Sequence, residues 1–75
     1  MDFSQVRSGM HARVVAIKSG STHMKRLQEM GLTVGTEFEV VKVAPFGDPV
    51  EIHLRGYRLC LRRRETADIT IEPID

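Results

Sequence analysis

The chain has 75 residues, of which 41% are hydrophobic and 28% are charged, and its formal net charge is +1. This composition is typical of one folded domain and excludes a disordered chain, while the net charge argues neither for nor against nucleic-acid binding. The single cysteine excludes an internal disulfide and favours a reducing compartment. The N-terminus has no signal-peptide pattern, and the longest apolar run, Val14–Ile17, is far shorter than the ~18 residues of a membrane span. The sequence predicts one soluble, cytoplasmic domain over residues 1–75.

The first predicted strand is His11–Lys18, which is short and rich in β-forming residues. Because Val14 and Val15 are adjacent, its alternation is imperfect, which indicates either a β-bulge or burial on both faces. In the lead-in before this strand, Phe3 and Val6 are expected to reach the core.

A short helix is predicted at His23–Met30, after a turn whose serines and threonine are suitable N-caps. Met24, Leu27 and Met30 recur at a spacing of three and are expected to face the core as one stripe. Gly31 is expected to end the helix, because glycine adopts a positive φ without the strain that a Cβ causes.

The second predicted strand, Glu37–Val43, contains the adjacent pair Val40 and Val41, which shifts its alternation from one face to the other. A strand that bends across the corner of a barrel has this pattern. The strand is followed by the segment Pro45–Pro49, whose prolines, glycine and aspartate predict a turn.

The next two strands, Val50–Leu54 and Tyr57–Leu61, form a hairpin if Arg55 and Gly56 are its two-residue turn. This register places three cross-strand pairs on the inner face: Leu54 with Tyr57, Ile52 with Leu59, and Val50 with Leu61. The outer face receives Glu51, His53, Arg58, Cys60 and Arg62.

Arg63–Thr66 is expected to form a loop or a single helical turn. Ala67–Glu72 is the last predicted strand, in which Ala67, Ile69 and Ile71 face inward. Five strands and one short helix predict a small, closed, all-β barrel. Closure suits so short a chain, because it removes exposed strand edges that would otherwise invite aggregation.

No catalytic pattern is present in the sequence. There is no P-loop, no H-E-x-x-H motif, no paired cysteines and no Ser-His-Asp order on which to build a triad. A barrel this small also has no interior room for a substrate. The sequence therefore predicts a binding protein and not an enzyme, with no required cofactor.

One group of polar side chains has the chemistry of a metal site. The hairpin register places Glu51 directly opposite Cys60, with His53 two residues along on the same face, and Cβ atoms of opposite residues lie ~5 Å apart. His11 and His23 are further candidates, across a dimer contact. The metal would be a divalent transition ion, zinc or iron. The alternative is a solvated sheet face that bears ordinary polar residues.

A second group consists of five arginines within ten residues: Arg55, Arg58, Arg62, Arg63 and Arg64. These guanidinium groups would meet phosphate or an acidic protein partner. Aromatic residues that would stack on bases are nearly absent, since Tyr57 is the single aromatic nearby. We therefore expect no nucleic-acid binding, and the alternative is a charged edge strand that blocks unwanted pairing.

The predicted turn Pro45–Pro49 holds Phe46 between two prolines. An exposed Phe46 would be a rigid apolar edge suited to a groove on a partner. Equally, Phe46 would cap the open end of the barrel.

These residues together resemble the FeoA family, ferrous iron transport protein A. The resemblance spans about Gly9 to Ile71 and rests on these matches: Arg26-Leu27, Glu29-Met30-Gly31-Leu32, Gly35, Val40-Val41, Ala44-Pro45, Gly47-Asp48-Pro49, Leu59, Leu61-Arg62, Ala67, Ile69 and Ile71. It implies an SH3-like β-barrel with a helix inserted after the first strand.

The resemblance also implies a small cytoplasmic accessory of bacterial ferrous iron uptake, which acts with a membrane permease that carries a cytoplasmic GTP-binding domain. We expect the contact groove to lie between the 45–49 turn and the helix-to-strand corner at Met30–Val34. The candidate contact residues are Met30, Leu32, Pro45, Phe46, Asp48, Pro49, Arg58 and Arg62. The rival function is metal binding, with zinc or ferrous iron joining two copies into a homodimer. A nucleic-acid-binding barrel comes third.

Overall fold

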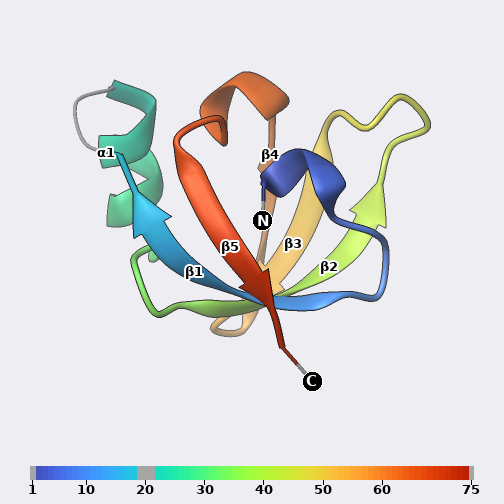
Figure 1. Ribbon diagram of the computed structural model, residues 1–75, viewed down its shortest axis with the longest axis horizontal. Helices are drawn as coiled ribbons and strands as arrows, with labels where there is room; N and C mark the ends of the chain where they lie inside the picture. Colours follow the sequence, from blue (N-terminus) through green and yellow to red (C-terminus); the bar gives the residue numbers. More distant parts are fainter. Residues whose placement is uncertain (1, 19–21, 75) are drawn as a thin grey trace.

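In the computed structural model, five antiparallel strands form one curved sheet in the order β4-β3-β2-β1-β5 (Figure 1). The strands are β1 (His11–Ile17), β2 (Glu37–Val43), β3 (Val50–Leu54), β4 (Tyr57–Leu61) and β5 (Ile69–Pro73). Outside the sheet lie the helix α1 (Thr22–Glu29) and two single 3-10 turns, η1 (Phe3–Gln5) and η2 (Arg63–Glu65). The structure describes residues 2–18 and 22–74, except for the side chains of residues 4 and 22–24.

The predicted order of elements and the predicted fold class are confirmed, and β2, β3 and β4 have the predicted bounds. Of the predicted N-caps of the helix, Ser19 and Ser21 lie outside the described residues, whereas Thr22 is the first residue of α1, one residue before the predicted start at His23. The last strand begins at Ile69, two residues later than predicted, and Ala67 is exposed, so its predicted inward position is wrong. The reason is that the chain is still turning there, since the N–H of Ile69 donates to the carbonyl of Thr66 at 3.1 Å.

The predicted closure of the barrel is not made by strand pairing. Within the described part of the chain, β4 and β5 are the two edges of the sheet and form no ladder with each other. The η2 turn separates them and sends the chain to the other side of β1, where Ile69 pairs with Ile17. The lead-in packs across the sheet instead: the Phe3 ring stacks on that of Phe38 with centroids 5.4 Å apart. Phe3 and Val6 are both buried, as predicted.

Both valine pairs mark irregularities in the ladder. The register of β1 against β5 shifts between Val14 and Ala16, and that of β2 against β3 shifts between Val40 and Lys42. Val14 and Val40 are fully buried, whereas Val15 is partly exposed. The predicted bulge is therefore confirmed, and the extra residue in each strand lets the sheet curve around its core.

One hydrophobic core fills the concave side of the sheet. The largest fully buried side chains come from all five strands, the helix and the segment after it: Leu27, Leu32, Ile52, Leu54, Leu61, Ile71, Val14 and Val40. Across the described residues, no helix has both the length and the apolar character that a membrane crossing requires.

The β3–β4 hairpin has the predicted register, with Ile52 opposite Leu59. Its two turn residues, Arg55 and Gly56, have φ values of 49° and 85°. A type I′ turn requires positive φ at both positions, which is why a glycine at the second one identifies the turn. Tyr57 differs from prediction: it lies at the end of the sheet and is 39% exposed.

The end of α1 is a Schellman motif. The N–H of Gly31 donates to the carbonyl of Gln28 at 3.0 Å, and the N–H of Leu32 donates to that of Leu27, also at 3.0 Å. Gly31 has a φ of 99°, and the two leucines are buried, which completes the motif with its hydrophobic contact. The chain reverses here, so Met30 is 39% exposed and its predicted place in the core stripe is wrong.

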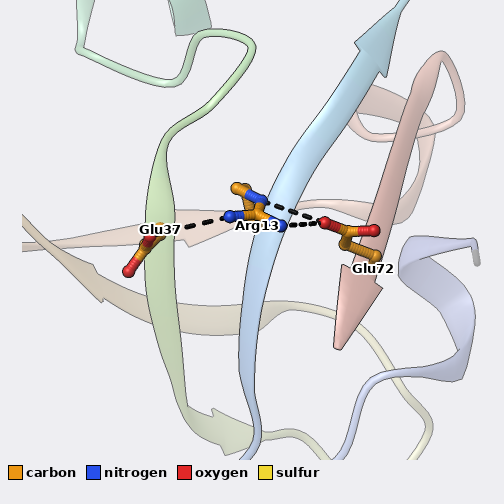
Figure 2. A network of polar contacts seen from close by, with 3 residues as sticks. All are labelled: Arg13, Glu37 and Glu72. Atoms are coloured by element: carbon orange, nitrogen blue, oxygen red, sulfur yellow. Dashed lines mark hydrogen bonds and ion pairs between the residues drawn. The ribbon is translucent and has the colours of Figure 1, made fainter. Parts of the chain in front are cut away.

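Arg13 links three strands on the outer face of the sheet, as Figure 2 shows. Its Nε donates to Glu72 Oε1 of β5 at 3.0 Å, its Nη2 contacts the same oxygen, and its Nη1 lies 4.0 Å from Glu37 Oε2 of β2. The hydrogen bond to Glu72, and then the charge of Glu72, raise the pKa of Arg13 above its ordinary value. The side chains remain half-exposed, so solvent screens this network.

We therefore expect Arg13→Gln to lower the melting temperature only slightly at low salt. The difference should largely vanish in molar salt, where the screening length falls to ~3 Å. Thermal unfolding of Arg13→Gln, Glu72→Gln and the double variant measures this, and the double variant should lose no more than either single one. A large loss that persists at high salt would contradict the screened ion pair.

Candidate functional site

The two halves of the predicted contact groove lie at opposite ends of the molecule. The 45–49 turn leads into Val50, which pairs with Leu61 at one end of the β3–β4 hairpin. At the other end Tyr57 begins β4, and its hydroxyl lies against Gly31. Figure 1 shows the same separation, with the β2–β3 turn and η2 at the top and the β3–β4 turn at the bottom. The predicted single groove is therefore wrong, because the hairpin stands between its two walls.

We call the upper region the tip surface, formed by Phe46, Asp48, Arg62, Arg63 and Arg64. Phe46 is 92% exposed, so it does not cap the barrel. The turn that carries it is held by two backbone hydrogen bonds, from Gly47 N to the Ala44 carbonyl at 2.7 Å and from Ala44 N to the Pro49 carbonyl at 3.2 Å. The ring thus projects from a braced turn into solvent.

The arginines of the tip surface line a shallow hollow of about 590 Å³ together with Asp48. The two carboxylates nearest to them are already engaged. Asp48 Oδ1 accepts a hydrogen bond from the backbone N–H of Arg63, and Glu65 Oε1 accepts one from that of Arg62, both at 2.9 Å. Glu65 Oε2 also accepts from Arg26 at 3.0 Å. The guanidinium groups of the tip surface therefore face solvent.

We call the lower region the corner surface, formed by Met30, Val34 and Tyr57, which are 39%, 61% and 39% exposed. The sequence predicted Met30 as a contact residue and included Val34 in the predicted corner Met30–Val34, but it missed Tyr57. Tyr57 was assigned to the core from its cross-strand phase, and only its position beside the hairpin turn, at the end of the sheet, could have indicated exposure. Leu32 was predicted as a contact residue, and this is wrong because Leu32 is fully buried beneath the corner.

A buried threonine holds the corner in shape. The hydroxyl of Thr36 donates to the carbonyl of Gly31 at 3.0 Å and accepts from the N–H of Thr33 at 3.2 Å. The N–H of Gly35 donates to the carbonyl of Val14 in β1 at 2.8 Å. These bonds fix the backbone beneath the exposed apolar side chains, so little ordering is needed when they are covered.

The predicted metal ligands are divided between separate rows of the sheet. Glu51 lies directly opposite Cys60, as predicted, and it forms an ion pair with Arg58 at 3.3 Å. A second row of cross-strand partners contains His53, which lies opposite Arg58 on β4 and opposite Glu39 on β2. His11 lies opposite Glu39 in the same row. Among the residues that the structure describes, no three His, Cys, Asp or Glu side chains gather to hold a metal ion. The side chain of His23 lies outside the described residues, and the metal hypothesis stays a prediction.

Residues 1–73 match the FeoA domain family. Over 74 residues the chain is 35% identical to the Fe(2+) transport protein A/Fe(2+) transporter FeoB fusion protein of Porphyromonas gingivalis. That alignment covers 99% of this chain and 9% of the fusion protein, so the chain spans less than a tenth of the relative's length.

Solved structures have the same fold. The FeoA protein from Chlorobium tepidum is 32% identical, with a TM-score of 0.86 over 100% of this chain and 71% of that chain. The zinc-complexed FeoA of Stenotrophomonas maltophilia, a prokaryotic SH3 domain protein, is 24% identical, with a TM-score of 0.80 over 96% of this chain and 89% of that chain. The second likeness concerns the fold alone, and it agrees with the predicted SH3-like architecture. Because the family match spans nearly the whole sequence, the chain belongs to the FeoA domain family.

Proposed function

We propose that this chain is an accessory of ferrous iron transport that binds the cytoplasmic GTP-binding domain of an iron permease and modulates its cycle. The observation that carries the proposal is the fusion protein of Porphyromonas gingivalis, in which a relative of this chain and an Fe(2+) transporter are one polypeptide. Fusion gives the two parts a high effective concentration with respect to each other. This favours formation of the complex when the two parts bind each other. The chain would then act at the cytoplasmic face of the membrane.

The corner surface supports this proposal as the docking contact. Methionine and tyrosine are enriched in the cores of protein interfaces, and Met30, Val34 and Tyr57 are exposed apolar groups on a hydrogen-bonded scaffold. A rigid surface loses little conformational entropy on binding, which leaves more of the contact free energy for affinity. Arg55 and Arg58 are exposed at the same end and would form the polar rim.

Val34→Asp is expected to weaken binding to the permease domain by at least about tenfold, because a carboxylate would be buried without a partner. Val34 is 61% exposed, so the variant should fold normally, which circular dichroism can check. Titration calorimetry of this chain with the purified cytoplasmic domain measures the affinity.

Phe46→Ser is the matched control, since it removes an exposed apolar group at the opposite end. It should bind as the unchanged chain does. Equal affinity of Val34→Asp and the unchanged chain would contradict the corner assignment. Absence of binding by the unchanged chain would contradict the proposed function itself.

A further inference from the structure

The tip surface combines a projecting aromatic ring with three arginines, which outnumber the single carboxylate of Asp48 in the same surface. Phe46 is 92% exposed at the end of a braced turn. The three arginines beside it line one hollow, and the side chain of Arg63 lies next to Gly47, the residue that follows Phe46. The ring and the guanidinium groups therefore belong to one small, projecting region.

The positive charge of this region exceeds the negative charge beside it, where Asp48 lines the same hollow and Asp2 lines a second hollow with Arg63. The described residues include no ion pair to the guanidinium groups of Arg62, Arg63 or Arg64. The carboxylate of Asp48 accepts from a backbone N–H, and Glu65 is shared between a backbone N–H and Arg26. Three cationic side chains thus line one hollow with a single carboxylate, and none of the three forms an ion pair with it.

Three further acidic side chains lie at the far end of the sheet. Glu37 and Glu39 lie at the start of β2, and Glu72 joins Glu37 through Arg13. Strand β2 runs from Glu37 to Val43, a distance of ~20 Å at the usual rise per residue. This distance exceeds the screening length of ~8 Å at physiological salt, so these acids do not cancel the field of the tip surface. The tip surface therefore has a local excess of positive charge, because its three arginines outnumber its one carboxylate.

We propose that the tip surface binds the surface of a bilayer that contains anionic phospholipids. The Phe46 ring enters the interfacial layer, and the arginines of the tip surface contact the phosphates of the headgroups. Basic and aromatic side chains on one small surface are the combination that holds proteins reversibly at anionic membranes. The proposal does not depend on the permease, and it uses the end of the molecule opposite to the corner surface.

A bilayer suits this surface better than a second protein does. Stable protein interfaces bury about 800 Å² on each partner and need a broad complementary area. The tip surface has one large apolar side chain on a projecting turn, and the other side chains that form it are three arginines and Asp48. A lipid interface accepts a single inserted ring, and each cation adds to the attraction independently.

Sedimentation with lipid vesicles tests the proposal on the full chain. At low salt the chain should bind phosphatidylcholine vesicles that contain phosphatidylglycerol and should not bind pure phosphatidylcholine. Arg64→Gln should weaken binding about fivefold and Phe46→Ser about tenfold or more. The matched controls, Arg55→Asn and Val34→Ser, remove one charge and one apolar group at the opposite end and should bind as the unchanged chain does.

A fluorescent reporter gives a second measurement, because the chain has no tryptophan. The emission of Phe46→Trp should shift to the blue on vesicles that contain phosphatidylglycerol, whereas that of Val34→Trp should not. Three outcomes would overturn the proposal: no binding to anionic vesicles, equal loss in the control variants, or displacement by inorganic phosphate with no blue shift, which indicates a free-anion site. Loss of permease-domain binding in Phe46→Ser without any vesicle binding would assign the tip surface to a protein partner and overturn it too.

Discussion

Replacing Leu32 with alanine is expected to lower the free energy of unfolding by about 2–5 kcal/mol. Leu32 is fully buried, packs into the core with Leu27, and donates its N–H in the bond that ends α1. Truncation leaves a cavity under the corner that a braced backbone cannot fill by collapsing. A 75-residue domain has a total stability of roughly 4–11 kcal/mol, so this one change removes a large part of it.

Urea denaturation followed by circular dichroism measures the loss. Val34→Ala is the matched control, because Val34 lies two residues further along and is 61% exposed, and its loss should stay within about 0.5 kcal/mol. If Leu32→Ala is unfolded in water, Leu32→Met keeps the side-chain volume and should cost less than about 1.5 kcal/mol. A Leu32→Ala protein as stable as Val34→Ala would mean that Leu32 is a surface residue, as the sequence suggested.

The sequence was sufficient to predict the features that follow from a local pattern of residues. A two-residue turn with glycine at its second position determines the register of the whole β3–β4 hairpin, and all of its predicted pairs occur. The adjacent valines Val14 and Val15 indicated either a bulge or burial on both faces, because a strand cannot bury neighbouring residues on one face, and the bulge is the alternative that occurs. In each case the evidence lies within a few residues of the feature.

The errors concern features that residue spacing along the chain did not determine. Met30 continues the helical spacing of Leu27, but α1 ends at Glu29 and the Schellman motif turns Leu32 inward in its place. The contact groove failed for a similar reason: its two walls are close in sequence to β2, yet the pairing of β2 with β3 and of β3 with β4 places them at opposite ends. The two resulting surfaces contain residues that were predicted as contacts, including the corner Met30–Val34, whereas the exposure of Tyr57 was not predicted.

Gly31→Ala is expected to destabilise the protein through two separate effects at the corner. The φ of 99° lies in the left-handed region, where a Cβ costs about 1–2 kcal/mol. A Cβ on Gly31 would also lie 2.8 Å from the Tyr57 hydroxyl oxygen, which is closer than real contacts allow. Because Tyr57 is 39% exposed, its ring can move away from the added Cβ. This movement relieves part of the close contact and displaces the Tyr57 side chain on the corner surface.

Gly35→Ala separates the two effects, since Gly35 has a φ of 92° in the same corner but nothing within 4 Å of the added Cβ. Urea denaturation should show a larger loss for Gly31→Ala than for Gly35→Ala, and the excess should disappear when Gly31→Ala is combined with Tyr57→Phe. The backbone strain should remain in that double variant, because removing the hydroxyl does not change φ. Equal losses of unfolding free energy for the two glycine variants would show that the close approach of Tyr57 does not contribute to the destabilisation. If the corner surface binds the permease domain, Gly31→Ala should also weaken that binding more than Gly35→Ala does, because only the first moves Tyr57.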